Sequence, residues 1–181
     1  ETFDIHGGGE DLIFPHHENE IAQSQAATGK PLANYWMHSG QLLKGGRKMA
    51  SDTGNIVTLR EVLDRGYTGR EIRFMLLGVH YRKPMLFSFK RLDAARTALK
   101  RIDEYTRKLL CLPAGLPHPE IASSVSELER RFTEAMNDDL NLSGAIGALF
   151  NFIKQTNPVV QARQLDRDQK NDVLEALRMV N

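Results

Sequence analysis

A short segment near the N-terminus concentrates the residue types that bind metals and nucleotides. The seventeen residues from Asp4 to Glu20 include three glycines, three histidines and five carboxylates. The glycine run Gly7–Gly9 would let a backbone loop adopt positive φ and approach a ligand with no Cβ in the way. We therefore expect a binding or catalytic site in this segment.

His16 and Glu20 have the spacing of two metal ligands on one helix. Residues four apart project from the same helical face, where an imidazole and a carboxylate can bind one cation and supply half of a tetrahedral zinc shell. An isolated pair of this kind is more often structural, because carboxylates in a first helical turn also stabilise the helix dipole. Asp11 and His6, which flank the same glycine run, favour the metal site.

The flanking sequence predicts the elements that must position these residues. Phe3 and Ile5 indicate the end of a short strand ahead of the glycines. Pro15 suits the first turn of a helix that runs to about Thr28, where Gly29 would end it. The site is thus expected between a strand and a helix.

A small β-element is predicted next. Residues 34–44 read as two short extended segments, and Gly45-Gly46 supplies a tight turn after them. Trp36 and His38 are interpreted as packing and hydrogen-bonding residues of this element. Lys48 then begins a polar loop, and its ammonium group either reaches a phosphate or is simply solvated.

The C-terminal two thirds of the sequence is predicted to be helical. Thr58 and Thr68 each begin a capping box, and Gly66 would end the first of the two helices. A long amphipathic helix is expected from Ser88 to about Leu112, followed by a Pro/Gly linker. Three more helices are expected near residues 125–136, 143–157 and 159–180.

Basic residues cluster in the long helix and just before it. A charge run of this kind usually forms a solvated helix face, although it also permits nucleic-acid binding. The residues are Arg82, Lys83, Lys90, Arg91, Arg96, Lys100 and Arg101.

The composition is ordinary for a water-soluble protein. Of 181 residues, 41% are hydrophobic and 26% are charged, and the formal net charge is +1. No apolar run could span a membrane and no signal peptide is recognisable, so we expect no membrane partner and a cytoplasmic location. The single cysteine, Cys111, cannot form an internal disulfide and is expected to pack near a core. Because the sequence opens at Glu1 without a methionine, we expect a portion of a longer protein.

Five segments, taken in order, resemble the cysteinyl-tRNA synthetase family of class I aminoacyl-tRNA synthetases. The most specific of them is Phe3 to Gln23. The other four are Tyr35 to Gly40, Lys48-Met49 with Gly54-Asn55, His80 to Arg82, and Met136 to Asn141.

This resemblance implies a mostly α chain, in which the remnant of a Rossmann-type α/β catalytic domain is followed by a helical bundle. Residues 1–56 would form the rear part of the catalytic domain with its Lys-Met loop. Residues 57–87 would form stem-contact helices, and residues 88–181 a helical tRNA-binding bundle.

The resemblance also implies a zinc site that binds the thiolate of the substrate cysteine. The family holds zinc with two cysteines, a histidine and a glutamate, and His16 and Glu20 occupy the last two of these four positions. Both cysteine ligands would lie upstream of Glu1, and Cys111 is in the wrong region to replace either. The isolated chain is therefore expected to bind zinc weakly or not at all.

The same resemblance assigns the ATP site. Gly8, Gly9 and Asp11 would line the adenosine pocket, with Asp11 accepting a hydrogen bond from the ribose. Lys48 would contact the ATP phosphates during adenylate formation, and His6 would stand near the metal and the substrate. Lys48 and His6 are thus the expected catalytic residues.

The sequence departs from the family pattern in two places. Ala50, Ser51 and Asp52 replace the Ser-Lys-Ser of the family's Lys-Met-Ser-Lys-Ser loop, so the second lysine is absent and Asp52 adds a negative charge. The His-Ile-Gly-His motif, which also holds ATP, belongs to the front of the catalytic domain and is not in this chain. The chain alone is therefore expected not to activate cysteine.

Three functions remain open at this stage. The first is an incomplete portion of a cysteine–tRNA ligase whose partners are cysteine, ATP and tRNA, and the retained metal and nucleotide residues favour it. The second is a non-catalytic tRNA-binding or regulatory paralogue, which the missing loop lysine favours. The third is a relative that joins cysteine to another amine. The sequence makes no prediction of oligomeric state.

Overall fold

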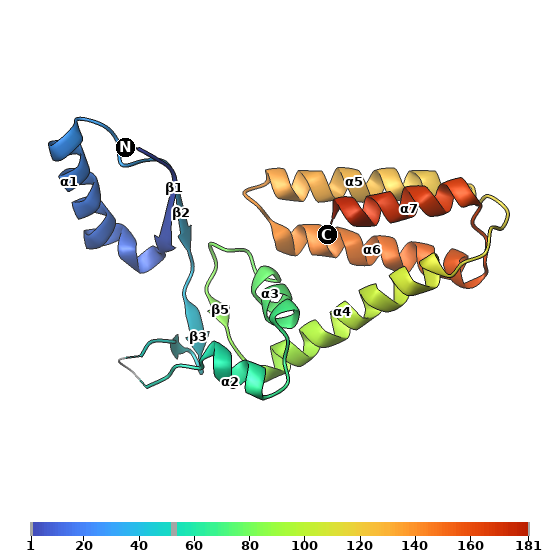
Figure 1. Ribbon diagram of the computed structural model, residues 1–181, viewed down its shortest axis with the longest axis horizontal. Helices are drawn as coiled ribbons and strands as arrows, with labels where there is room; N and C mark the ends of the chain where they lie inside the picture. The colour runs from blue at the N-terminus through green and yellow to red at the C-terminus, as the bar shows by residue number, and fades with distance from the viewer. Residues whose placement is uncertain (1, 52–53, 181) are drawn as a thin grey trace. The chain divides into compact units, whose positions relative to one another are not determined.

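In the computed structural model, which describes residues 2–51 and 54–180, the chain divides into two compact units (Figure 1). The first unit comprises Glu1–Gly66 and Tyr81–Ser88, and the second comprises Tyr67–His80 and Phe89–Asn181. The chain therefore passes from one unit to the other three times. Within the described residues, no helix has both the length and the apolar character needed to cross a membrane.

The first unit begins with a βαβ arrangement. Strand β1 (Phe3–Gly9) pairs in parallel with β2 (Ala33–Ser39), and helix α1 (Glu18–Thr28) lies between them in the chain. Parallel strands joined by a helix are the building unit of Rossmann-type sheets. The fold class predicted from the sequence, a mostly α chain with a Rossmann-type remnant and a helical bundle, is confirmed.

Helix α1 begins later than the sequence predicted and ends where it predicted. Two short helical turns, η1 (Glu10–Leu12) and η2 (Ile13–His17), precede it, and Phe14 has extended dihedral angles (φ −133°, ψ 132°). Pro15 therefore lies in a kinked turn, and the regular helix starts three residues later, at Glu18. Gly29 closes the helix with a left-handed φ of 67°, as the glycine signal indicated.

A three-stranded sheet completes the first unit. Its strand order is β4 (Arg47–Lys48), β3 (Leu42–Lys44) and β5 (Met85–Leu86), and β5 arrives from the later segment of the unit. Gly45 and Gly46 join β3 to β4 with φ of 59° and 78°, the two positive values that tight hairpin turns require. The predicted turn is confirmed.

Helix α2 (Leu59–Asp64) belongs to the first unit and has half of the predicted capping box. The Thr58 side chain accepts a hydrogen bond from the backbone N–H of Glu61 at 3.1 Å. The Glu61 carboxylate accepts from Arg65 at 3.2 Å, and the reciprocal bond to the Thr58 backbone is absent among the described residues.

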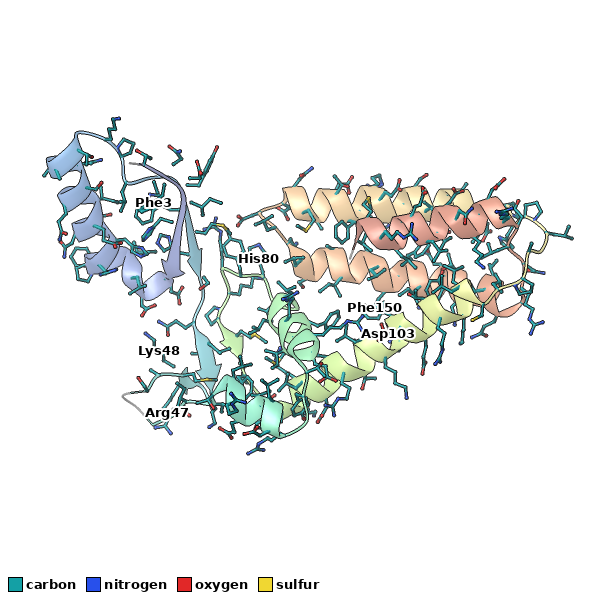
Figure 2. All side chains as sticks on the ribbon, in the orientation of Figure 1. Phe3, Arg47, Lys48, His80, Asp103 and Phe150 are labelled. Carbon is teal, nitrogen blue, oxygen red and sulfur yellow. The ribbon has the colours of Figure 1, made fainter. Side chains whose placement is uncertain are left out.

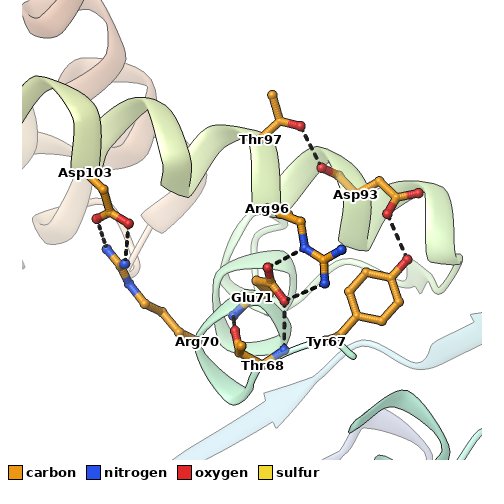
Figure 3. A network of polar contacts seen from close by, with 8 residues as sticks. All are labelled: Tyr67, Thr68, Arg70, Glu71, Asp93, Arg96, Thr97 and Asp103. Carbon is orange, nitrogen blue, oxygen red and sulfur yellow. Dashed lines mark hydrogen bonds and ion pairs between the residues drawn. The ribbon is translucent and has the colours of Figure 1, made fainter. Parts of the chain in front are cut away.

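The second unit begins with helix α3 (Gly69–Leu77), whose capping box is complete. The Thr68 backbone N–H donates to Glu71 Oε2 at 2.7 Å, and the Glu71 N–H donates to Thr68 Oγ1 at 3.3 Å. The Glu71 carboxylate also accepts from Arg96 of α4 (Phe89–Leu110), with Nε at 2.6 Å (Figure 3). The hydrogen bond from Arg96, with the backbone bonds, holds the pKa of Glu71 below its ordinary value.

The remaining helices form a bundle with the C-terminal half of α4 (Figure 1). Their bounds are α5 (Ile121–Asn137), α6 (Leu142–Gln161) and α7 (Arg167–Met179). The sequence placed the break between the last two helices near residue 158, but α6 continues through Pro158 to Gln161. Helix α7 starts only after Asp166, whose side chain caps it by accepting from the Gln169 N–H.

The bundle core contains one buried polar pair. Tyr105 Oη lies 2.7 Å from Thr156 Oγ1, and Thr156 donates to the backbone carbonyl of Phe152 at 2.8 Å. Both side chains are 2% exposed, and burial raises the pKa of Tyr105 to about 12. Cys111, in contrast, is exposed, so the prediction that it packs near the core is wrong. The helix ends at Leu110, which leaves Cys111 in the turn that follows.

Candidate metal centre and nucleotide site

Four side chains of the first unit form a cluster around one carboxylate. Glu20, in the first turn of α1, has Oε2 at 3.1 Å from His6 Nε2 and at 4.0 Å from His17 Nε2. Its other oxygen, Oε1, lies 3.7 Å from His16 Nε2. We call His6, His16, His17 and Glu20 the histidine–glutamate cluster. The structure thus brings together the two ligands expected from the sequence, His16 and Glu20, and adds His6 and His17.

One atom of this cluster lacks a hydrogen-bond partner. Glu20 Oε2 is buried, and among the described residues none donates a hydrogen bond to it with acceptable geometry, although His6 Nε2 lies within ion-pair distance. A buried carboxylate oxygen without a partner is costly, so such an atom suits a cation-binding position. Ligand atoms of His6, His17 and Glu20 all lie within 4.8 Å of one another. Imidazole nitrogen and carboxylate oxygen are both zinc ligands, so the donor set fits that metal.

Gly8 allows the cluster to assemble against β1. A Cβ at this position would lie 2.9 Å from His17 Cε1 and 3.1 Å from His17 Nε2. The expectation that Gly7–Gly9 adopt positive φ is wrong, because all three are extended residues of β1. Close approach, rather than a left-handed backbone, is what requires glycine at Gly8.

His17 is the residue that the sequence analysis missed. Its side chain is 4% exposed, whereas the neighbouring His16 is 59% exposed. His17 Nδ1 lies 2.8 Å from His38 Nε2, and the Trp36 ring packs 5.1 Å from the His17 ring. Burial, followed by the nearby His38 and His6, holds the pKa of His17 below its ordinary value. The interpretation of Trp36 and His38 as packing and hydrogen-bonding residues agrees with these contacts.

The strand register contains a signal that could have identified this arrangement. His6 lies opposite Trp36, and Gly8 lies opposite His38, in the parallel pair β1–β2. Residues two apart on a strand share a face, so these four positions form one face of the sheet. An aromatic and two imidazoles on one face leave room at Gly8 for a further ring.

The expected nucleotide residues meet beside the cluster's glycine run. Lys48 Nζ lies 2.5 Å from Asp11 Oδ2, and both side chains are partly exposed (Figure 2 labels Lys48). The hydrogen bond from Lys48 holds the pKa of Asp11 below its ordinary value. Gly9 leaves space for this carboxylate, because a Cβ there would displace the Asp11 side chain from its present position. The site thus presents one cation and one anion, paired with each other.

Two of the three residues that depart from the expected lysine loop lie within the described part of the chain. Ala50 and Ser51 follow Met49 in the described part, so the loop offers no second ammonium at these positions. Asp52, the third departure, lies outside the described residues.

Two more of the family-resembling segments, His80 to Arg82 and Met136 to Asn141, contain residues that make contacts within the protein. His80 Nε2 is 3.9 Å from Asp139 Oδ2, and Asp139 and Leu140 adopt left-handed φ of 52° and 56° in the turn between α5 and α6. Asn141 caps α6 by accepting from the Gly144 N–H at 3.0 Å. This segment therefore forms a turn with a capping residue.

Several of the basic residues of α4 have protein partners. Arg96 is bound by Glu71 and lies 4.5 Å above the Tyr67 ring (Figure 3). Lys100 lies 3.9 Å from Glu104, and Arg101 lies 5.3 Å from the centre of the Phe150 ring. The contact of Arg96 joins α4 to α3, that of Lys100 stays within α4, and that of Arg101 joins α4 to α6.

Comparison with known proteins decides the family. The family model described as "tRNA synthetases class I (C) catalytic domain" matches residues 1–97, and the DALR domain model matches residues 131–181. The chain belongs to the cysteinyl-tRNA synthetase family. The resemblance stated from the five sequence segments is therefore confirmed.

Curated relatives in the cysteinyl-tRNA synthetase family match nearly the whole chain. The cysteine–tRNA ligase of Chlamydia felis is 41% identical over 187 residues, which cover 99% of this chain and 38% of the relative. The cysteine–tRNA ligase of Carboxydothermus hydrogenoformans is 43% identical over 182 residues, which cover 99% of this chain and 39% of the relative. The chain thus spans about two fifths of the length of these relatives.

A solved structure shares the fold. Agrobacterium radiobacter K84 agnB2 LeuRS, determined in a ternary complex with tRNA and LeuAMS, has a TM-score of 0.70 at 16% identity, covering 98% of this chain and 25% of that one. At this identity the likeness shows the fold alone.

Proposed function

We propose that this chain is part of an ATP-dependent cysteine–tRNA ligase, which activates cysteine as an adenylate and transfers it to tRNA. The observation that carries the proposal is the buried Glu20 Oε2, which faces imidazoles and has no hydrogen-bond partner among the described residues. Relatives named cysteine–tRNA ligase match 99% of the chain, which supports the same reading of the site. The chain is an incomplete portion of that enzyme, and alone it is expected to be inactive.

His16 and Glu20 would hold zinc together with two cysteines from outside this chain. When bound, zinc would supply a Lewis-acid position that prefers a thiolate to a hydroxyl group, which separates cysteine from serine better than packing could. His16 Nε2 lies 3.7 Å from Glu20 Oε1, and His6 Nε2 lies 3.1 Å from Glu20 Oε2, so His6 would orient this carboxylate. The hydrogen-bonded pair His17–His38 closes the buried side of the cluster.

Asp11 and Lys48 would bind adjacent parts of ATP, the ribose and the phosphates. Gly8 and Gly9 let the backbone approach the adenosine, and Asp11 would accept a hydrogen bond from the ribose. Lys48 would move from Asp11 to the phosphates, where its ammonium group offsets the negative charge that develops as pyrophosphate leaves. Their 2.5 Å contact supports this assignment, because it puts both groups at one location.

A second candidate is a non-catalytic paralogue that binds tRNA. Ala50 and Ser51 favour it, because the loop lacks the second lysine that the family resemblance leads one to expect. Arg82, Lys83 and the basic residues of α4 would supply the contacts to tRNA. A third candidate, a relative that joins cysteine to another amine, would use the same zinc and ATP residues. The cytoplasmic location and the boundaries after residues 56 and 87 stay predictions.

The test is cysteine-dependent exchange between ATP and pyrophosphate, measured on the full-length protein beside a Ser51→Lys variant. We expect exchange with cysteine and none with serine. Exchange that appears only in Ser51→Lys would place the defect in the loop and support the paralogue. Silence in both proteins, with tRNA binding retained, would refute adenylate formation by this protein.

A further inference from the structure

The side chain of Asn55 lies against the hairpin that carries Lys48. Its amide nitrogen Nδ2 is 2.9 Å from the backbone carbonyl of Lys44 and 3.4 Å from the carbonyls of Arg47 and Lys48. Lys44 is the last residue of β3, and Arg47 and Lys48 constitute β4. One side chain therefore contacts both strands of the hairpin, on either side of the Gly45-Gly46 turn.

Strand β4 lies at the edge of its sheet, and its backbone pairing within the described residues is short. Strand β4 is two residues long, and its register with β3 has two residue pairs, Leu43 with Lys48 and Lys44 with Arg47. The Met49 N–H adds one bond to the Leu42 carbonyl at 2.8 Å. β3 is also paired with β5, whereas β4 has β3 as its one neighbour in the described sheet. A side-chain donor that binds carbonyls of both strands therefore has a large share in fixing the position of β4.

The chain reaches this point through a glycine turn. Gly54 has a left-handed φ of 63°, and its N–H donates to the Ser51 carbonyl at 3.3 Å. This turn directs the next residue, the half-buried Asn55, back to the hairpin. Asparagine suits the position because a short amide can donate two hydrogen bonds, which the hydroxyl of serine or the carboxylate of aspartate cannot do.

We propose that Asn55 is a positioning residue for Lys48. By fixing both strands of the hairpin, its amide holds the Lys48 backbone so that the ammonium group reaches Asp11, 2.5 Å away, and with it the location assigned to ATP. The described hydrogen bonds of the Asn55 side chain go to the hairpin and not to Asp11, so Asn55 would act through Lys48. The catalytic meaning of this role rests on the proposed function, whereas the structural role does not.

The structural role is tested by trypsin cleavage after Arg47 and Lys48, both exposed, in the full-length protein without ATP. Asn55→Ala removes the donor, and Asn55→Asp puts a carboxylate among the three carbonyls. We expect cleavage to be about fivefold faster in both variants, because the lost hydrogen bond stabilises the closed hairpin against local opening. Asn34→Ala, a change at an exposed asparagine of β2, is the matched control and should cleave like the wild type. Equal cleavage of all four proteins would overturn the proposal.

The catalytic role is tested in the exchange assay by a double-mutant cycle. Asn55→Ala should lower kcat/KM for ATP by about tenfold or more and leave KM for cysteine unchanged, because a displaced catalytic group affects one substrate. In a Lys48→Ala background the same change should cost nothing further. A loss of equal size in both backgrounds would show that Asn55 acts independently of Lys48 and would refute the assignment. Silence of the wild-type enzyme would refute the proposed function instead, and the cleavage rates would then decide on Asn55 alone.

Discussion

The buried pair Tyr105–Thr156 predicts an unequal response to removal of its two hydroxyl groups. Thr156 donates to the Phe152 carbonyl, so the hydrogen in the 2.7 Å contact must come from Tyr105. Tyr105→Phe leaves a threonine hydroxyl that still donates, which should cost about 1 kcal/mol of unfolding free energy. Thr156→Val keeps the volume but leaves the tyrosine hydroxyl buried without an acceptor, which should cost about 2–3 kcal/mol.

The double variant decides whether this reasoning is right. Replacing both residues leaves no unpaired hydroxyl, so the double variant should be about 1 kcal/mol more stable than Thr156→Val alone. Urea unfolding of the chain followed by far-UV circular dichroism reports mainly on this unit, because its helices dominate the signal. Thr97→Val is the matched control, since Thr97 makes the same bond to a carbonyl four residues earlier on an exposed face, and it should change stability by less than about 0.5 kcal/mol. A double variant less stable than Thr156→Val would refute the donor assignment.

Three further predictions concern the bundle core, the site and a helix cap. Burial raises the pKa of Tyr105 from 10.0 to about 12, so the unfolding free energy should fall by up to about 2–3 kcal/mol as the pH rises from about 10 to about 12. Urea unfolding at alkaline pH measures this loss, which should be smaller in Tyr105→Phe. Gly8→Ala should lower the zinc content of the full-length protein, because its Cβ would meet the buried imidazole at 2.9 Å, whereas Gly69→Ala, with no atom within 4 Å, should retain zinc; metal analysis of the purified proteins compares them. The hydrogen bond from Arg96 lowers the pKa of Glu71 below its ordinary value of 4.5. The ionised Glu71 carboxylate therefore contributes stability above pH 4.5, and this stability should be lost as the pH falls through the lowered pKa. Glu71→Gln should remove this acid dependence and Glu61→Gln should leave it unchanged, as amide exchange in the first turns of α3 and α2 can show.

Local rules predicted the elements whose causes are local. Gly29 ends α1, Gly45-Gly46 turns the hairpin, and the Thr68–Glu71 box starts α3 because each depends on one or two residues and on backbone geometry. The Thr58 box is incomplete for a similar reason, since its glutamate has a competing arginine one turn later.

The sequence named candidate residues for the site but not their arrangement. The sequence indicated His6, His16 and Glu20, yet it could not tell that His17 rather than His16 is the buried histidine of the pair. That distinction depends on the register of β1 with β2, which places His38 opposite Gly8. Strand register is a long-range property, so neighbouring residues do not encode it.

Helix bounds failed where the chain tolerates an unfavourable residue. Two helices were expected to meet near residue 158, but α6 passes through Pro158, since packing of the bundle outweighs one lost backbone hydrogen bond. Pro15 was expected to lie in regular helix, but the extended Phe14 before it delays α1.

The threefold passage between the two units constrains how the protein can be dissected. A fragment that stops at Gly66 lacks β5, and it also lacks Tyr81, whose carbonyl accepts from the Gly40 N–H at 2.7 Å. A fragment that starts at Phe89 keeps the bundle but loses α3, whose Glu71 binds Arg96. No single cut therefore yields two intact pieces. A stable minimal bundle would need a designed linker that connects residue 80 to residue 89 in place of residues 81–88.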